Sequence, residues 1–197
     1  MKRNMNKNKS LVNKKMKRNR ILLALLGMLL LIIVTKGIVY NGTDQILYKD
    51  YILQYSKEYR LNPYLVMAII KTESNFDKDA ISPKGAMGLM QITESTAEWV
   101  AESTGTADFE IHDLYDPETN IKMGCWYINK LREEFGTTEL ILAAYNAGPG
   151  NVDEWLKDSD ISKDGQKLDN IPFVETDNYI KKVLSNEEIY QHLNETN

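Results

Sequence analysis

The sequence has few of the residues from which covalent crosslinks and metal centres are built. Cys125 is the only cysteine, so no disulfide can form within the chain and a stable domain must depend on its hydrophobic core. The two histidines, His112 and His192, are far apart, which does not favour a metal site of histidine and cysteine. Residues 158–163 resemble a calcium loop only faintly, because Lys163 stands where such loops have glycine. We therefore expect neither a metal ion nor a cofactor.

Patterns typical of nucleotide-binding and repeat proteins are absent as well. The chain contains no Gly-x-Gly-x-x-Gly sequence, no P-loop and no internal repeat. No segment alternates apolar and polar residues convincingly enough to predict a strand. A small hairpin is plausible only over residues 81–92, where Pro83, Gly85 and Gly88 are turn formers. The sequence therefore favours a mainly helical domain.

Apolar residues recur at helical spacing along most of the remaining chain. Proline after asparagine or aspartate is typical of a helix start, and glycine is typical of a helix end. In the first half of the chain we predict a helix over 45–60, one from Asn62-Pro63 to about Phe76, and one of about ten residues that begins at a Ser95–Glu98 capping box. In the second half we predict a helix from Asp116-Pro117 to Gly136, a short helix over 140–145, a helix that begins at Pro149, and a last helix capped by Thr176 or Asp177. Residues 158–170 are polar and predict an exposed loop.

The N-terminal forty residues have a composition unlike the rest. Residues 1–20 contain nine of the 24 basic residues and no acidic residue, so the part after Arg20 has a formal charge of about −13. Residues 21–34 are uncharged and almost entirely apolar, and the stretch reaches a membrane-spanning length if it continues to Tyr40. This order of a basic head and an apolar run is typical of a signal peptide or a signal anchor.

We favour an uncleaved signal anchor, because no small-residue cleavage site follows Val34. Residues 1–20 would then be a basic cytoplasmic tail, 21–40 a transmembrane helix, and 41–197 an extracytoplasmic domain. A cleaved signal peptide and a buried core helix are the alternatives for the apolar run. A nucleic-acid-binding arm is the alternative for the basic head, but the adjacent apolar run favours the membrane.

Glu73 is the strongest candidate for a catalytic residue. It ends an apolar helical stretch, 65–70, and a glycine-rich turn, 82–91, follows soon after it. A carboxyl group at the inner end of an apolar helix is expected to be partly buried, and burial raises its pKa because it disfavours the charged form. An acid that stays protonated near neutral pH can donate a proton to a leaving oxygen.

Four sequence blocks resemble the soluble-lytic-transglycosylase family of peptidoglycan-cleaving enzymes, whose catalytic domain is similar to goose-type lysozyme. The blocks are Glu73-Ser74, the run from Ser82-Pro83 through Gly88-Leu89-Met90-Gln91, the run 144–150 that contains Tyr145 and Asn146, and Glu175-Thr176-x-x-Tyr179. Gly124 and Tyr127 agree with the helix that precedes the third block. All four occur in order over about residues 48–185, and the resemblance implies a mainly α, lysozyme-like fold with at most a small β-hairpin.

The resemblance implies that Glu73 protonates the oxygen between N-acetylmuramic acid and N-acetylglucosamine, then accepts the proton of the muramic C6 hydroxyl as that oxygen attacks C1. The products would carry 1,6-anhydro ends, and no second carboxylate is needed. Two alternatives remain open: a lysozyme-type hydrolase, in which Asp77 could be the second carboxylate, and a non-catalytic wall-binding module. Otherwise Asp77, Asp79 and Glu94 are solvated surface charges.

The resemblance also implies substrate contacts. They are expected at Ser82, Gly88, Met90, Gln91, Tyr127, Tyr145, Asn146, Glu175 and Tyr179. Several of these have a structural alternative: a Ser-Pro turn for Ser82, a hydrogen bond to a turn for Gln91, core packing for Met90 and Tyr127, a helix end for Asn146, and a helix cap for Glu175. One departure from the family pattern is Thr93-Glu94, where relatives commonly have Met-Pro, so one sugar contact is expected to differ. Thr93 is also a candidate cap for the next helix.

Overall fold

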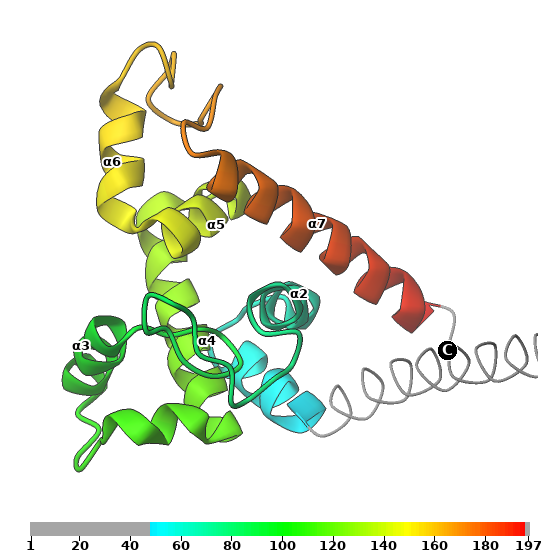
Figure 1. Ribbon diagram of the computed structural model, residues 1–197. Helices are drawn as coiled ribbons and strands as arrows, with labels where there is room; N and C mark the ends of the chain where they lie inside the picture. The colour runs from blue at the N-terminus through cyan, green and yellow to red at the C-terminus, as the bar shows by residue number, and fades with distance from the viewer. Residues whose placement is uncertain (1–47, 196–197) are drawn as a thin grey trace, which may run out of the picture. The chain divides into compact units, whose positions relative to one another are not determined.

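The computed structural model describes residues 48–195, which form an almost entirely helical domain (Figure 1). Its helices are residues 48–58, α2 (Pro63–Glu73), α3 (Glu94–Thr104), the 3-10 helix η1 (Ile111–Tyr115), α4 (Pro117–Phe135), α5 (Thr138–Ala147), α6 (Pro149–Lys157) and α7 (Val174–Glu195). Within this described part, β-structure is limited to two isolated bridges, Ile81 with Met87 and Met87 with Ile92. The predicted mainly helical fold is confirmed for the described residues, and the bridges lie where a small hairpin was expected.

The predicted N-terminal anchor lies outside the described residues. Among residues 48–195, no helix is both long and apolar enough to cross a bilayer.

Local sequence signals set several helix boundaries as expected. The Asn62 side chain accepts a hydrogen bond from the backbone N–H of Tyr64 (3.0 Å) at the start of α2, and Asp116 does the same for Thr119 (2.9 Å) at the start of α4. Gly136 ends α4 with φ +76°, a conformation that costs glycine little.

Three predicted boundaries were wrong. Helix α2 ends at Glu73 rather than near Phe76, because Asn75 and Phe76 take positive φ and turn the buried Phe76 ring into the core. Helix α3 is capped by Thr93, whose side chain accepts from the Thr96 N–H, and not by Ser95. Helix α7 begins at Val174, before the predicted cap, and η1 was not predicted.

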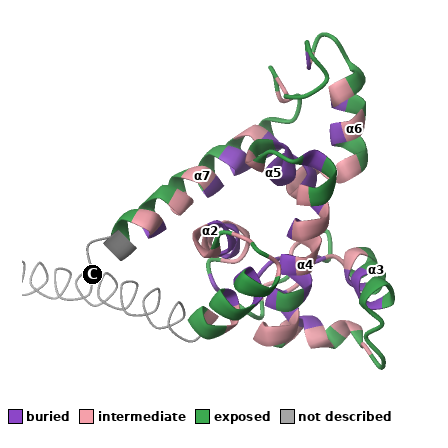
Figure 2. Ribbon diagram, turned by 180° about the vertical axis from the view of Figure 1, so that it is seen from behind, coloured by how far each residue is buried: buried purple, intermediate pink, exposed green. Residues whose placement is uncertain are grey.

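The core forms where α2 packs against α7 and where α5 packs against α4, α6 and α7 (Figure 2). Helix α2 is deeply buried: Val66, Ala68, Ile69 and Ile70 have no exposed surface. Burial of these side chains stabilises the fold by about 1.5–3 kcal/mol for each large residue. Because the last turn of α2 is held rigidly in this way, the position of Glu73 at its end is fixed.

Buried Asn120 of α4 holds the loop of residues 80–92, hereafter the 80–92 loop, against the core. Its amide nitrogen donates to the carbonyl oxygens of Met87 (3.0 Å) and Leu114 (2.8 Å), and its amide oxygen accepts from the Met90 N–H (2.8 Å). The Ser74 hydroxyl donates to the Leu89 carbonyl oxygen (2.8 Å). The 80–92 loop is thereby tied both to α4 and to the residue after Glu73.

Candidate active site

Glu73 is partly buried at the C-terminal end of α2. Burial raises the pKa of its carboxyl group to about 7, and the negative charge of Glu175 acts in the same direction. The Tyr179 hydroxyl and the positive charge of Lys182 oppose this effect and lower the pKa. The predicted environment of Glu73 agrees with the structure: near neutral pH its protonated and ionised forms are similarly populated.

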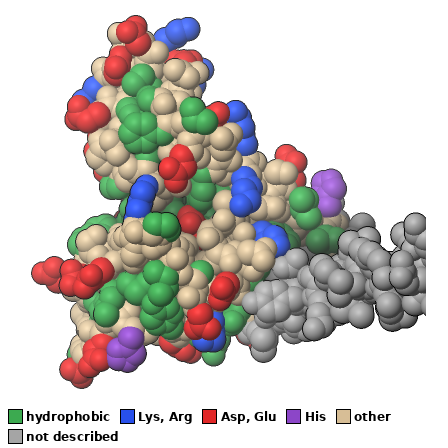
Figure 3. Space-filling model, viewed as in Figure 1, with side chains coloured by type: hydrophobic (Ala, Val, Ile, Leu, Met, Phe, Trp, Pro, Cys, Tyr) green, Lys and Arg blue, Asp and Glu red, His purple; other side chains and the backbone are tan. Residues whose placement is uncertain are grey.

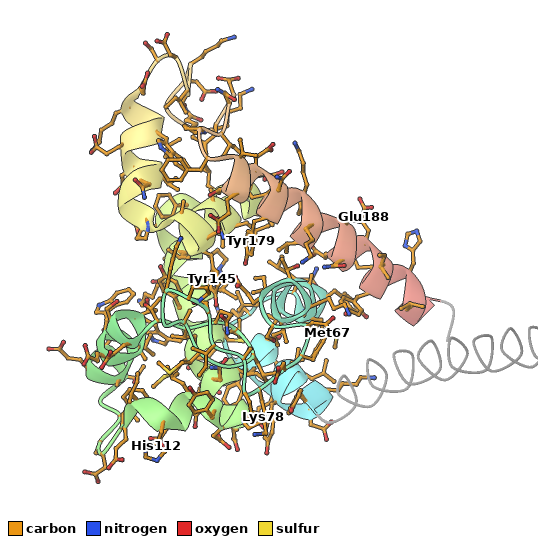
Figure 4. The ribbon with its side chains drawn as sticks, viewed as in Figure 1. Met67, Lys78, His112, Tyr145, Tyr179 and Glu188 are labelled. Atoms are coloured by element: carbon orange, nitrogen blue, oxygen red, sulfur yellow. The ribbon has the colours of Figure 1, made fainter. Side chains whose placement is uncertain are left out.

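Two tyrosines, Tyr145 of α5 and Tyr179 of α7, interact with the charge of Glu73. Figure 4 labels both, and they lie close together between these two helices. The Tyr145 hydroxyl donates to the carbonyl oxygen of Met90 (2.7 Å), so Tyr145 joins α5 to the 80–92 loop. The Tyr179 hydroxyl is buried and makes no hydrogen bond of standard geometry with the described residues, although it is close enough to interact with the Glu73 carboxyl group. Burial, followed by the charge of Glu73, raises the pKa of both hydroxyls well above the ordinary value, so both remain protonated.

A pocket opens beside Tyr145. Its volume is about 280 Å³, and the residues that line it come from the 80–92 loop, the start of α3, α4 and the α5–α6 junction: Gln91, Ile92, Thr93, Thr96, Tyr127, Tyr145, Asn146, Ala147, Gly148 and Pro149. Four of the predicted contact residues, Gln91, Tyr127, Tyr145 and Asn146, therefore share one pocket. Figure 3 shows the surface hollowed between the α5–α6 region and the α2 region.

In Gln91 and in Asn146, one of the two polar atoms of the side-chain amide is hydrogen-bonded within the protein. The Gln91 nitrogen donates to the carbonyl oxygens of Ala80 (3.1 Å) and Gly88 (3.0 Å), which leaves its oxygen to accept a further hydrogen bond. The Asn146 oxygen accepts from the buried Thr176 hydroxyl (2.8 Å), which leaves its nitrogen as a donor. The pocket thus offers one acceptor and one donor at fixed positions.

Tyr127 lies between Tyr145 and Trp99. Its ring centroid is 5.4 Å from that of Tyr145 and 6.0 Å from that of Trp99. Burial raises the pKa of Tyr127 to about 12. Thr93, where the family pattern has methionine, lines the same pocket while it caps α3.

The structure gives three predicted contact residues a role in holding the 80–92 loop, and the substrate contact of Ser82 stays a prediction. The Met90 side chain is fully buried against Gly124, so it cannot contact a sugar in this conformation, and only its carbonyl oxygen faces Tyr145. Gly88 is buried, and a Cβ atom there would overlap the Asn120 side chain and the Leu114 carbonyl oxygen. The Ser82 hydroxyl accepts from the N–H groups of Lys84 (3.3 Å) and Ala86 (3.0 Å), the arrangement of a serine turn.

Glu175 is exposed and makes no hydrogen bond to Glu73 or Tyr145. It acts on Glu73 through its charge, and its expected contact with the substrate stays a prediction. Sequence reasoning also missed Asn120, Thr176, Lys182 and Trp99. Their roles depend on contacts between distant segments, and the Thr176 position within the fourth block was the only available signal.

No group of three or more His, Cys, Asp or Glu side chains within the described residues could hold a metal ion. In the segment expected to resemble a calcium loop, Asp158 instead accepts a hydrogen bond from the Asp160 N–H (2.9 Å).

Comparison with known proteins agrees with this geometry. The family model described as "Transglycosylase SLT domain" matches residues 50–167. The soluble lytic murein transglycosylase of Salmonella typhimurium is 36% identical over 148 residues, which cover 74% of this chain and 23% of that protein.

Two solved structures have the same fold. An inactive mutant of the lytic transglycosylase Slt from Pseudomonas aeruginosa matches with a TM-score of 0.64 and 35% identity. The match covers 74% of this chain and 24% of the Slt chain. A complex of the 70-kDa soluble lytic transglycosylase with bulgecin A matches with a TM-score of 0.67 and 32% identity. The match covers 76% of this chain and 25% of the chain in that complex. The chain thus spans about a quarter of the length of the relatives it matches. Because the family model matches more than half of the chain, residues 50–167, the chain belongs to the transglycosylase SLT domain family.

Proposed function

We propose that this chain is a peptidoglycan lytic transglycosylase that cleaves the β-1,4 bond between N-acetylmuramic acid and N-acetylglucosamine. The observation that carries the proposal is a partly buried carboxyl group, Glu73, whose pKa is raised to about 7 and which interacts with Tyr145, a residue that lines a pocket with fixed polar groups. Half-protonation near neutral pH suits a residue that must first donate a proton and then accept one.

In the first half of the reaction, the protonated Glu73 donates its proton to the glycosidic oxygen as the C1–O bond breaks. N-acetylglucosamine leaves with that proton as a new hydroxyl group. In the second half, the C6 oxygen of the same muramic residue bonds to C1, and its hydroxyl proton passes to the Glu73 carboxylate. The product is a 1,6-anhydro ring, and Glu73 is protonated again for the next cycle.

The surroundings of Glu73 support an intramolecular nucleophile. A hydrolase of the usual kind needs a second carboxylate at a set separation across the bond. Asp77, Asp79 and Glu94 are all exposed, and Asp77 accepts a hydrogen bond from the Asp79 N–H (3.0 Å) within its own turn. Glu175 is exposed as well and acts on Glu73 through its charge. Tyr179 supplies a protonated hydroxyl beside Glu73, which favours the carboxylate form once the proton has left.

We also propose peptidoglycan strands as the substrate, on the strength of the relatives, and bulgecin A as a ligand of the same pocket, since a related transglycosylase has been solved in complex with it. The N-terminal sequence supports a signal anchor over 21–40 that would hold residues 41–197 outside the membrane, close to the cell wall.

The test is digestion of purified peptidoglycan by the full chain, followed by mass spectrometry of the fragments. We expect 1,6-anhydro ends, and loss of at least about 10²–10⁴-fold in rate for Glu73→Gln. Asp77→Asn is the matched control, because it removes an exposed carboxylate four residues away and keeps the acceptor oxygen. Reducing ends in place of anhydro ends would indicate a hydrolase. Binding without cleavage by the wild-type chain would indicate a wall-binding module.

A further inference from the structure

Trp99 presents an unusually large apolar surface for its position. It is 45% exposed on α3, yet it contacts two other aromatic rings: Trp126, with a centroid distance of 5.0 Å and an interplanar angle of 74°, and Tyr127, at 6.0 Å and 89°. Neither ring is stacked parallel to the indole. Trp99 is therefore held by two T-shaped ring contacts, and nearly half of its surface remains open to solvent.

The ring contacts continue from Trp99 into the pocket. Tyr127 contacts Trp99 on one side and Tyr145 on the other, and Tyr145 lies beside Glu73. Thr96, one helical turn before Trp99 on the same face of α3, lines the pocket together with Tyr127. An unbroken aromatic path thus leads from the carboxyl group of Glu73 out to an exposed indole.

An exposed, fixed indole at the end of such a path suits a sugar ring. The axial C–H groups of a pyranose form a flat apolar face, and an aromatic ring offers it a matching surface with little loss of conformational freedom. Trp126 is itself held by the Lys130 ammonium group, which lies 5.5 Å from its ring centroid. This contact stiffens the support beneath Trp99.

We propose that Trp99 forms a distal subsite for the glycan strand, beyond the sugars that occupy the pocket at Tyr127 and Tyr145. The inference rests on the proposed function, because that function supplies the polymer that extends from the pocket. The subsite makes the chain prefer long strands to short oligosaccharides. It does not take part in the chemistry at Glu73.

The test compares kcat/KM of the full chain on long glycan strands with kcat/KM on the shortest oligosaccharide that is cleaved. We expect Trp99→Ala to lower the ratio of the two values about fivefold to tenfold. Trp99→Tyr, which keeps a flat ring, should retain most of the ratio, whereas Trp99→Leu, which keeps only apolar bulk, should not. Leu53→Ala is the control, because Leu53 is similarly exposed (43%) and lies on the helix of residues 48–58.

The ratio is independent of how much of each variant is folded, since inactive protein lowers both values equally. An unchanged ratio in Trp99→Ala would overturn the subsite and leave the proposed function intact. If the wild-type chain cleaves no strand, the proposed function is wrong. The subsite is then tested by comparing how tightly long strands bind to Glu73→Gln and to the Glu73→Gln/Trp99→Ala double variant. Weaker binding by the double variant supports the subsite, and equal binding excludes it.

Discussion

Tyr179 of α7 holds its buried hydroxyl beside the carboxyl group of Glu73 at the end of α2. The two residues are more than a hundred positions apart in the sequence and meet because α7 packs along α2. A second contact, from the Asn186 side-chain nitrogen to the Thr72 hydroxyl (3.0 Å), fixes the two helices one residue before Glu73. The protonation of Glu73 is therefore controlled by a helix–helix interface.

Replacement of Tyr179 by phenylalanine should raise the pKa of Glu73. The hydroxyl favours the ionised carboxylate, so its removal disfavours ionisation, and the pKa is expected to rise above 7 by about one unit. The measurement is the pH dependence of kcat/KM. Because the general acid must be protonated, the limb on which activity falls with increasing pH should move to higher pH.

Tyr190→Phe is the matched control for this change, because it removes the hydroxyl of another buried tyrosine farther along α7. It should leave the midpoint of the descending limb where it is. A midpoint that does not move in Tyr179→Phe would show that the hydroxyl has no effect on the Glu73 carboxyl group.

Opposite charges on α7 should shift the same midpoint in opposite directions. Lys182 lowers the pKa of Glu73 and Glu175 raises it, so Lys182→Gln is expected to move the midpoint up and Glu175→Gln to move it down. Both side chains are exposed, and water and salt screen their charges, so each shift should be about half a pH unit and should shrink at high ionic strength. Shifts in the same direction for both variants would contradict an electrostatic origin.

The raised pKa of Glu73 also has a cost in stability. Its pKa is about 7 in the folded state and 4.5 in the reference state, so the unfolded chain gives up the proton first as the pH rises. The contribution of Glu73 to the free energy of unfolding is therefore most favourable below pH 4.5 and declines until about pH 7. The loss amounts to about 2–3 kcal/mol.

Glu73→Gln removes this loss, since the amide does not ionise. We expect the variant to be more stable than the wild type at pH 8 by about 2–3 kcal/mol and nearly equal to it at pH 4.5, measured by urea denaturation. Glu133→Gln is the control with the opposite sign: hydrogen bonds from Lys130 and Asn129 lower the pKa of the exposed Glu133 carboxyl group. A constant difference between Glu73→Gln and wild type across this pH range would contradict the raised pKa.

The parts of this structure that the sequence predicts are those set by short-range interactions. The starts of α2 and α4 follow from a capping side chain next to proline, and the end of α4 follows from Gly136. For the start of α3 the sequence offers two candidate caps, Ser95 and Thr93, and it is the Thr93 side chain that accepts the backbone hydrogen bond. Nothing local distinguishes them.

The sequence predicted where the candidate site residues lie better than it predicted what each of them does. Glu73, Tyr145 and Tyr179 come together, and Gln91, Tyr127 and Asn146 share the pocket, as the ordered blocks suggested. Met90 and Gly88 belong to the same blocks but serve the packing of the 80–92 loop. That difference depends on Asn120 and Gly124 of α4, which are about thirty residues away, so no nearby residue reveals it.

Gly88 provides the sharpest test of how the 80–92 loop is held. Its φ of +74° disfavours any side chain, and a Cβ atom would meet the Leu114 backbone carbonyl, which cannot turn aside. Gly88→Ala should therefore lower the free energy of unfolding by about 2–4 kcal/mol. Gly150→Ala is the matched control, since no atom lies within 4 Å of a Cβ there and α6 gains a better helix former; it should be neutral or slightly stabilising. Equal stability of the two variants would mean that the contact between Gly88 and Asn120 is not tight.

The same substitution should also affect activity. Because the Tyr145 hydroxyl donates a hydrogen bond to the Met90 carbonyl oxygen of this loop, a displaced loop in Gly88→Ala should reduce cleavage of peptidoglycan, whereas Gly150→Ala should retain it.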